Sequence, residues 1–401
     1  MAHAILISAD CHAAVKSDGQ GSNPHDAEMR RYVSPGYREA YDAWLEERPR
    51  MGAEVVARMG NELFADVDER DNVVRRDFRI KAQDDDIAGT AGWDPQRRIQ
   101  ELESDGVVAD IIYPNGVPFQ VAFNTRGVSA ELEREGVRAY NRWLAEFCSY
   151  SPERHAGCAV LQVSDVGEAV NDVDWAWRHG LRAVFLDPMA DGGPHYNHPC
   201  YEPLWRACAE RAMPVVFHSS PLTPFDYGPY PGSTAIFTYE TTWFAHRPFW
   251  FICCGGVLER YPGLKVLFAE QGETWAPAML AELDLRAGAG VLGRAAVRHM
   301  KLKPSEYWYR QCALTTTGSI AVGLRHATGV DNIMWGTDYP HMEGSYPNSV
   351  TVLKKSLAGI PADEAVKMIG GNAARFFNFD LAKLQQVADR VGPELSDLIA
   401  A

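Results

Sequence analysis

Asn332-Ile-Met-Trp-Gly-Thr-Asp338-Tyr-Pro-His341 is the segment from which the fold can first be inferred. Its apolar part, Ile333 to Trp335, predicts a short buried strand, and Pro340 ends regular structure soon afterwards. Asp338 therefore lies at, or just beyond, the carboxyl end of this strand. A carboxylate at that point is either a turn residue before a proline or part of a functional site. The choice depends on whether other segments place similar side chains at similar points.

The size and composition of the chain indicate a large globular protein. It has 401 residues, of which 46% are hydrophobic and 23% are charged. This length is long for one domain unless the fold is an α/β barrel with insertions. The formal net charge is −14 and Lys and Arg do not cluster, which argues against nucleic acid and against an anionic membrane as partners.

The cysteines and the N-terminal segment indicate a cytoplasmic protein. The eight Cys residues form no C-x-x-C pair, and Cys253 and Cys254 lie in an apolar run where buried free thiols are expected. The first residues lack a basic region, and their apolar run is too short for a secretory signal. No apolar run is long enough to span a bilayer.

Eight apolar segments alternate with helical segments, and each predicts a strand. The predicted strands are residues 4–9, 109–113, 155–161, 183–186, 214–218, 264–270, 312–315 and 333–335. They are apolar without polar alternation, which is typical of a parallel sheet buried on both faces. Eight such units predict a closed (β/α)₈ TIM barrel. A doubly wound open sheet is the alternative, but no G-x-G-x-x-G follows the first strand.

The helical segments complete the expected architecture of one domain over residues 1–401. Between the strands we expect helices at 95–105, 129–150, 166–179, 201–211, 241–261, 274–286 and 320–328, with a loop from 287 to 311. A polar stretch of about residues 13–92, with helices at 35–48 and 52–61, is read as an insertion after the first strand. It would serve as a lid or as an oligomer contact. A C-terminal helical extension is expected at 362–370, at 373–377 and from Asp380.

Polar side chains stand at the carboxyl ends of four predicted strands. These are Asp10 and His12 after the first strand, His218 after the fifth, Glu270 after the sixth and Asp338 after the eighth. In a barrel these ends form the active-site rim. Asp10 and His12 are two residues apart, so both point the same way in an extended segment. Together these imidazoles and carboxylates suit one divalent ion, Zn²⁺, Mn²⁺ or Fe²⁺.

Each of these residues has an ordinary explanation when it is taken alone. His12 and His218 could be hydrogen-bonded histidines of the core, and Asp10 could cap a turn. Their joint occurrence at strand ends favours a functional site. His246, in the segment after the fifth strand, and His341, three residues beyond Asp338, are weaker candidates for contact with a substrate.

Several segments, in order along the chain, resemble the amidohydrolase-related family. They are Asp10-Cys-His12, Val215-Val-Phe-His-Ser219, Gly256-Val-Leu-Glu-Arg-Tyr-Pro-Gly-Leu-Lys-Val-Leu-Phe-Ala-Glu-Gln-Gly-Glu-Thr-Trp-Ala-Pro277, Trp335-Gly-Thr-Asp-Tyr-Pro-His341 and Gly371-Asn-Ala-Ala-Arg-Phe-Phe377. This branch of the amidohydrolase superfamily includes aminocarboxymuconate-semialdehyde decarboxylase and resorcylate-type decarboxylases. The resemblance covers nearly the whole chain except about residues 13–80.

The resemblance implies a (β/α)₈ barrel with one divalent metal and a homodimeric or homotetrameric assembly. Asp10, His12 and His218 fall at the family's metal-ligand positions, and Asp338 falls at the aspartate that touches the metal and shuttles a proton. Asp10 replaces the first histidine of the usual H-x-H, and the added negative charge favours a harder metal such as Mn²⁺. Glu270 stands where characterised decarboxylases of this group usually carry histidine.

Because of Glu270, the expectation placed first is hydrolysis of a carbonyl-type bond in a small, ring-containing substrate. A metal lowers the pKa of bound water from about 15.7 to roughly 7. Asp338 would accept the proton, and Glu270 would orient the water or act as a second acid or base. Trp275 and Tyr339, together with the insertion, would shape the substrate pocket.

The alternative is a non-oxidative decarboxylase of an aromatic or unsaturated carboxylic acid. The metal would then chelate the substrate carboxylate or an adjacent phenolate, and Asp338 would protonate the ring carbon. Arg247 is the candidate clamp for the carboxylate, with His246 and His341 close to the substrate. A third possibility, a non-catalytic binding protein, would not need to retain one metal ion per chain.

Overall fold

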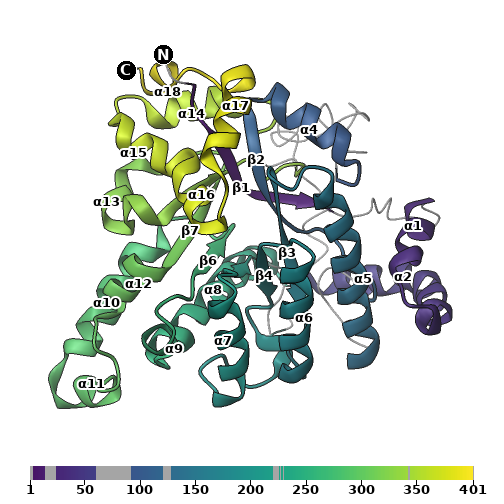
Figure 1. The fold of residues 1–401 in the computed structure, drawn as a ribbon. Coiled ribbons are helices and arrows are strands. Elements are labelled where there is room, and N and C mark those ends of the chain that lie inside the picture. Colours follow the sequence, from purple (N-terminus) through teal and green to yellow (C-terminus); the bar gives the residue numbers. More distant parts are fainter. Residues whose placement is uncertain are drawn as a thin grey trace.

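The computed structural model describes residues 3–13, 24–59, 92–120, 128–219, 225, 227–228, 230–341 and 344–400. Eight parallel strands follow one another in chain order around a barrel (Figure 1). The strands are β1 (Leu6–Ala13), β2 (Val107–Pro114), β3 (His155–Leu161), β4 (Ala183–Leu186), β5 (Val215–His218), β6 (Val266–Ala269), β7 (Cys312–Thr317) and β8 (Ile333–Gly336). The predicted (β/α)₈ TIM barrel and all eight strands are confirmed.

The seam between the last and the first strand closes the barrel at its carboxyl end. Cys11 pairs with Tyr339 in a parallel bridge. The backbone N–H of Asp338 donates to the carbonyl of Asp10 at 2.8 Å, and that of His12 donates to the carbonyl of Tyr339 at 2.7 Å. Gly336 permits this approach, because a Cβ there would lie only 2.4 Å from the Cβ of Asp10. The seam thus brings the end of β1 and the residues just after β8 together at the rim.

Helices surround the barrel (Figure 1), and four of the described helices begin at a capping side chain. Asp94, Ser129, Asp165 and Asp380 each accept a backbone N–H from the first turn of the helix that follows. The helices between β2 and β8 are α5 (Ala130–Ser149), α6 (Val166–Arg178), α7 (Glu202–Glu210), α8 (Ser233–Cys254), α9 (Val257–Arg260), α10 (Trp275–Gly288), α11 (Gly290–Ala296), α12 (Pro304–Gln311) and α13 (Arg325–Thr328). Before β2 lies α4 (Pro95–Ser104).

Three helical predictions need correction. The loop expected at 287–311 contains α11 and α12, and the start of α12 was signalled by Pro304 at its first position and by Glu306 in a capping box. The helix expected at 320–328 is a 3₁₀ turn followed by the four-residue α13, which ends at Gly329 with φ 102°. The helix expected from residue 241 begins eight residues earlier, at Ser233.

The C-terminal helical extension is present. It consists of α14 (Ser349–Leu357), α15 (Ala362–Val366), α16 (Asn372–Phe377), α17 (Leu381–Val391) and α18 (Leu395–Ile399). A π-helical turn, Lys367–Gly371, joins α15 to α16. The helix α14 is an addition to the prediction.

The predicted insertion is described in part. It contains α1 (Pro24–Tyr32) and α2 (Arg38–Met59), which extends the helix expected at 35–48 without the expected break; residues 14–23 and 60–91 lie outside the described residues. The segment docks on α5, where the N–H of Ser34 donates to the carboxylate of Glu135 at 2.7 Å. Its role as a lid or an oligomer contact stays a prediction.

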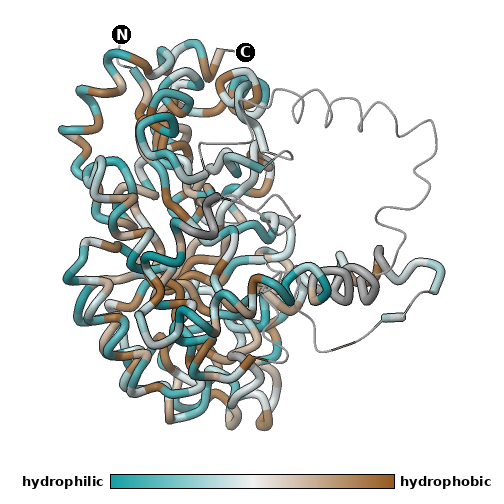
Figure 2. Tube along the Cα trace, turned by 90° about the vertical axis from the view of Figure 1, so that its right-hand side faces the viewer, coloured by the Kyte–Doolittle hydropathy of each residue, from teal (hydrophilic) through white to brown (hydrophobic). Residues whose placement is uncertain are grey.

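The core consists of the strands and the inner faces of the helices. Every residue of β1 to β6 and of β8 is buried. Hydrophobic residues accordingly gather toward the middle of the molecule, while the outer helices alternate between hydrophobic and hydrophilic positions (Figure 2). Among the described helices, none combines the length and the hydropathy that a bilayer crossing requires.

Candidate active site

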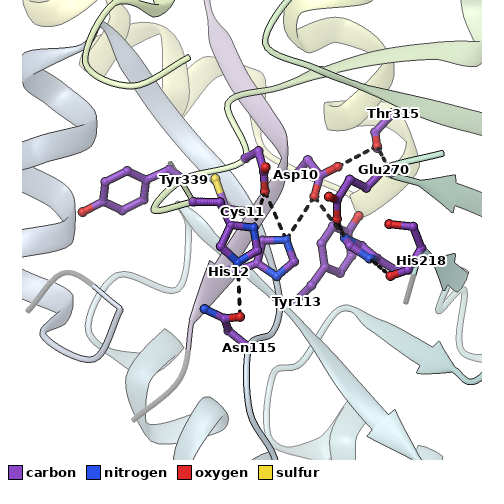
Figure 3. Close-up of polar contacts among 12 residues, drawn as sticks. Asp10, Cys11, His12, Tyr113, Asn115, His218, Glu270, Thr315 and Tyr339 are labelled. Carbon is purple, nitrogen blue, oxygen red and sulfur yellow. Dashed lines mark hydrogen bonds and ion pairs between the residues drawn. The ribbon is translucent and has the colours of Figure 1, made fainter. Parts of the chain in front are cut away.

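Four predicted ligands converge at the carboxyl rim of the barrel, and Figure 3 shows three of them, Asp10, His12 and His218, close together. Asp10 Oδ1 lies 3.6 Å from His12 Nε2 and 3.4 Å from His218 Nε2. His12 Nε2 lies 3.3 Å from Asp338 Oδ1. All four side chains are buried. We call Asp10, His12, His218 and Asp338 the rim cluster.

The rim cluster fits a single divalent metal ion. Atoms that each bind one ion at about 2.1 Å lie about 3.0–3.4 Å from one another, close to the separations in the cluster. His12 Nε2 and both carboxylate oxygens of Asp338 are buried without a hydrogen bond of normal geometry among the described residues. Such orphaned acceptors need a positive partner.

The second nitrogen of each histidine fixes the orientation of the ring. His12 Nδ1 lies 3.2 Å from the carbonyl of Pro114, and His218 Nδ1 lies 2.6 Å from the carbonyl of Ser219. A carbonyl only accepts, so Nδ1 carries the proton in both rings and Nε2 is the metal-facing nitrogen. Loss of the proton from Nε2 would therefore leave each histidine in the tautomer that a metal ligand requires.

The two carboxylates beyond β6 and β8 are held by an unusual backbone. Glu270 has φ 51° and Asp338 has φ 58°, in the left-handed region that side chains other than glycine seldom adopt. This conformation costs of order 1 kcal/mol or more per residue and is characteristic of functional sites. It brings Glu270 Oε2 to 3.1 Å from His218 Nε2.

The electrostatics of the site favour a bound cation. Burial by itself lowers the pKa of His12, but Asp10 and Asp338 outweigh burial and raise it to about 10. Burial by itself raises the pKa of Asp338, but contacts with His12 and His341 hold it below its ordinary value. Burial, with Asp10 nearby, raises the pKa of Glu270. A proton and a metal ion compete for the same excess of negative charge.

His341 extends the rim cluster toward the substrate side. Its Nδ1 lies 2.8 Å from Asp338 Oδ1, and its Nε2 lies 3.2 Å from Asn115 Oδ1. Its ring stacks on His12 with centroids 4.0 Å apart. His341 therefore connects Asp338 to the open side of the site.

A cavity of about 360 Å³ opens beside the rim cluster, which is room for a small ring compound. The metal-side lining comprises His12, His218, Glu270 and His341. The remaining lining residues are Pro114, Asn115, Ser219, Phe237, Thr238, Thr241 and Thr242. The last four belong to α8, which forms one wall of the cavity.

The other predicted site residues lie outside this lining in the described part of the chain. His246 stacks on Trp275 with centroids 4.0 Å apart. The guanidinium of Arg247 lies over the rings of Trp243 and Phe251 at 5.5 and 5.4 Å.

Tyr339 is also remote from the cavity. It is buried and hydrogen-bonds Glu101 away from the cavity. The substrate or catalytic roles predicted for Tyr339, His246, Trp275 and Arg247 stay predictions, and their positions give them no support.

Sequence reasoning missed the residues that bring hydroxyl and amide groups to the site. Asn115 follows β2 directly and Thr315 lies in β7, so the strand-end argument used for Asp10 and Asp338 would have found both. The threonines of α8 gave a weaker signal. Thr238, Thr241 and Thr242 share one helix face only once the true start of α8 is known.

Comparisons with known proteins identify the family of this chain. The sequence model described as amidohydrolase matches residues 10–379. The decarboxylase orsB of Emericella nidulans is 28% identical over 55% of this chain and 68% of its own length. Gamma-resorcylate decarboxylase of Rhodococcus jostii is 27% identical over 65% of this chain and 83% of its own length.

Solved structures share the fold. The 5-carboxyvanillate decarboxylase LigW of Sphingomonas paucimobilis matches with a TM-score of 0.62 and 21% identity, over 94% of this chain and 99% of its own. The dihydroxybenzoic acid decarboxylase of Polaromonas sp. JS666, solved with bound manganese and 2-nitroresorcinol, matches with a TM-score of 0.60 and 17% identity, over 94% and 97%. With the family model covering most of the chain, this protein belongs to the amidohydrolase family.

Proposed function

We propose that this enzyme is a metal-dependent, non-oxidative decarboxylase of an aromatic carboxylic acid. The observation that carries the proposal is the name shared by its curated relatives, which are decarboxylases aligned over 68% and 83% of their own lengths. The ring-sized cavity beside the rim cluster supports it. Manganese is the metal we propose for the rim cluster, because the Polaromonas decarboxylase carries it.

The proposed chemistry assigns a proton to Asp338. When bound, the metal would hold the substrate carboxylate and an adjacent phenolate oxygen. Asp338, whose pKa is held low, receives a proton through His341 and gives it to the ring carbon that bears the carboxylate. The bond from this carbon to the carboxylate then breaks, its electron pair returns to the ring, and CO₂ leaves. His341, which contacts Asp338 at 2.8 Å and lines the cavity, conducts the replacement proton.

The wall formed by α8 would recognise the rest of the ring. Thr241 and Thr242 donate their hydroxyl protons to the carbonyls of Thr238 and Tyr239, at 3.0 and 2.9 Å. Their oxygens can therefore accept hydrogen bonds from a hydroxyl substituent of the substrate. The described lining contains no Lys or Arg, so the metal takes the clamp role that the sequence suggested for Arg247.

This proposal reverses the order of the two reactions expected from the sequence. Hydrolysis was placed first because Glu270 replaces a histidine. The contact of Glu270 with His218 gives it a place beside the metal ligands, which suits either reaction. The curated relatives favour decarboxylation.

A paired substrate panel tests the proposal. Purified enzyme loaded with Mn²⁺ is assayed for CO₂ release from hydroxybenzoic acids, and in parallel for hydrolysis of amides, esters and lactones. We expect CO₂ release that disappears when Asp338 is replaced by Asn. Hydrolysis without CO₂ release would overturn the proposal and restore the first expectation.

We propose further that the enzyme forms the homodimer or homotetramer expected from the family resemblance. Light scattering on the purified full chain measures the mass directly. A monomeric mass across a concentration series would reject this assembly.

A further inference from the structure

Thr315 lies at the junction of two carboxylates of the site. It is a fully buried residue of β7. Its hydroxyl lies 2.9 Å from Asp10 Oδ2, and the backbone N–H of Glu270 lies 2.9 Å from the same hydroxyl (Figure 3). The hydroxyl oxygen of Thr315 therefore connects Asp10 of the rim cluster to Glu270.

The direction of both hydrogen bonds follows from the groups involved. A backbone N–H only donates, so Thr315 Oγ1 accepts from Glu270. An ionised carboxylate only accepts, so the single hydroxyl proton of Thr315 points to Asp10. The hydroxyl is the one side-chain group of Thr315 that can serve both partners.

The hydrogen bond from Thr315 gives the two carboxylate oxygens of Asp10 different partners. Oδ2 is occupied by Thr315, whereas Oδ1 faces His12 Nε2 and His218 Nε2 at 3.6 and 3.4 Å. Without the hydroxyl, the carboxylate could rotate about its last bond and present either oxygen. A held carboxylate loses less conformational freedom when it binds an ion.

We propose that Thr315 is a positioning residue for the metal: its hydroxyl fixes Asp10 as a one-oxygen ligand through Oδ1. The same hydroxyl anchors Glu270 at the residue where its backbone turns left-handed, with φ 51°. Thr315 itself touches neither metal nor substrate in this scheme. The inference concerns the metal centre and holds for either reaction considered above.

The neighbouring residue supplies a matched control. Thr316 is buried in the same strand, and its side chain points to the opposite face of β7. Its hydroxyl has no hydrogen-bond partner among the described residues. Replacing either threonine by valine removes one buried hydroxyl at nearly constant volume, but only Thr315→Val removes contacts with the site.

The test is a metal titration of four proteins freed of metal by chelation: wild type, Thr315→Val, Thr315→Ser and Thr316→Val. Mn²⁺ binding is followed by calorimetry, and folding is checked by the melting temperature in excess chelator. We expect Thr315→Val to bind Mn²⁺ about 10- to 100-fold more weakly, the usual effect of removing a partner of a metal ligand. Thr315→Ser, which keeps the hydroxyl, should bind close to wild type, as should Thr316→Val.

Two results would overturn the inference. One is Thr315→Val binding Mn²⁺ as tightly as wild type. The other is equal weakening in Thr315→Val and Thr316→Val, which would indicate a general effect of altering β7. If valine at 315 gives no folded protein, Thr315→Ala is titrated in its place, and it must show the same loss relative to Thr315→Ser.

The outcome is independent of the proposed reaction. A normal titration of Thr315→Val beside CO₂ release by wild type rejects the inference and leaves the decarboxylase proposal standing. Weakened Mn²⁺ binding by Thr315→Val, together with no CO₂ release by wild type from any acid, supports the inference about Thr315 and rejects the decarboxylase proposal.

Discussion

Two buried groups of aspartate and histidine lie in this barrel, and they differ in how the carboxylates are satisfied. In the inner network, which consists of Arg98, Asp110 and His155, Asp110 Oδ2 accepts from Arg98 Nε at 2.7 Å. Asp110 Oδ1 lies 2.7 Å from His155 Nδ1. In the rim cluster the corresponding separations are 3.3–3.6 Å, and the oxygens of Asp338 lack hydrogen bonds of normal geometry among the described residues.

The difference shows how a structural network can be told from a metal site. The inner network contains its own cation, because the guanidinium of Arg98 is buried against Asp110. The ion pairs of the described residues give Asp10, Glu270 and Asp338 no Lys or Arg partner. The rim cluster instead takes its positive charge from solution, as a proton on His12 or as a metal ion in its place.

Metal removal should have the largest effect on activity and stability. If it had no effect, the rim cluster could not be distinguished from the inner network as a metal site. Chelation should abolish turnover, and Mn²⁺ at 100 times its dissociation constant should restore about 2.7 kcal/mol of stability. Elemental analysis of protein prepared without chelator should give one divalent ion per chain. Full activity after chelation, with no bound metal, would show that the rim cluster is satisfied in another way.

The substitution Asp338→Asn should have the second-largest effect on turnover. The amide keeps the shape of the side chain but cannot transfer the proton, so turnover should fall by about 10²- to 10⁴-fold while metal binding persists. Turnover and metal content are measured on the same preparation. Unchanged turnover would reject the proton-transfer role of Asp338.

Arg98→Met tests the inner network. It leaves the carboxylate of Asp110 buried beside His155 alone, which should cost about 3–5 kcal/mol of unfolding free energy. Urea unfolding of metal-free protein measures this cost. Arg97→Met is the control on the same helix, because its pair with Glu101 is more exposed and should contribute less than about 1 kcal/mol. Equal losses in the two variants would remove the distinction between buried and exposed pairs.

A buried histidine outside both groups gives a smaller, pH-dependent effect. His246 stacks on Trp275, and burial lowers its pKa to about 4. Above about pH 6.5 the folded and unfolded chains both hold it neutral. As the pH falls toward 4, only the unfolded chain binds the proton, so stability should fall by on the order of 2–3 kcal/mol.

His246→Phe should remove this part of the acid sensitivity while keeping the stack. Urea unfolding at pH 7 and pH 4.5 measures it as a change in the difference between the two pH values. The matched control is His179→Phe, an exposed ring that stacks on Trp175. If His179→Phe changed the pH dependence as much as His246→Phe, burial would not be its cause.

The repeating part of the fold could be predicted from the sequence. Short apolar runs located all eight strands, and polar residues in or just after β1, β5, β6 and β8 marked the residues that the structure brings together at the rim. Helix boundaries were harder where no capping residue stands at the start. The residue before α8 is Gly232, which has a left-handed backbone and no side chain that could mark the start of a helix. The first two turns of α8, which carry Phe237 and Thr238 of the cavity wall, were therefore missed.

The directions of side chains around the rim could not be read from spacing. Tyr339 follows Asp338 directly, yet its side chain lies against Arg98 and Glu101. The backbone of Asp338 is left-handed, with φ 58°, so the alternation of an extended strand does not apply there. Arg247 and His246 follow a strand in sequence, but they lie on α8, where the turn of the helix sets their direction. The positions of side chains at the end of a strand could be predicted from the sequence. The directions of side chains beyond the strand depend on tertiary contacts, which the sequence pattern does not show.

The seam at Gly336 has a consequence for the order of assembly. Asp10 and His12 enter the site from the first strand and Asp338 from the last, so an emerging or truncated chain holds only part of the coordination sphere. High-affinity capture of the ion must then wait until the barrel has closed. Once captured, the ion would tether the first strand to the segment after the last strand, and cross-links that span long loops restrict the unfolded chain the most. Metal binding would thus indicate that all eight strands of the barrel have been synthesised and have folded.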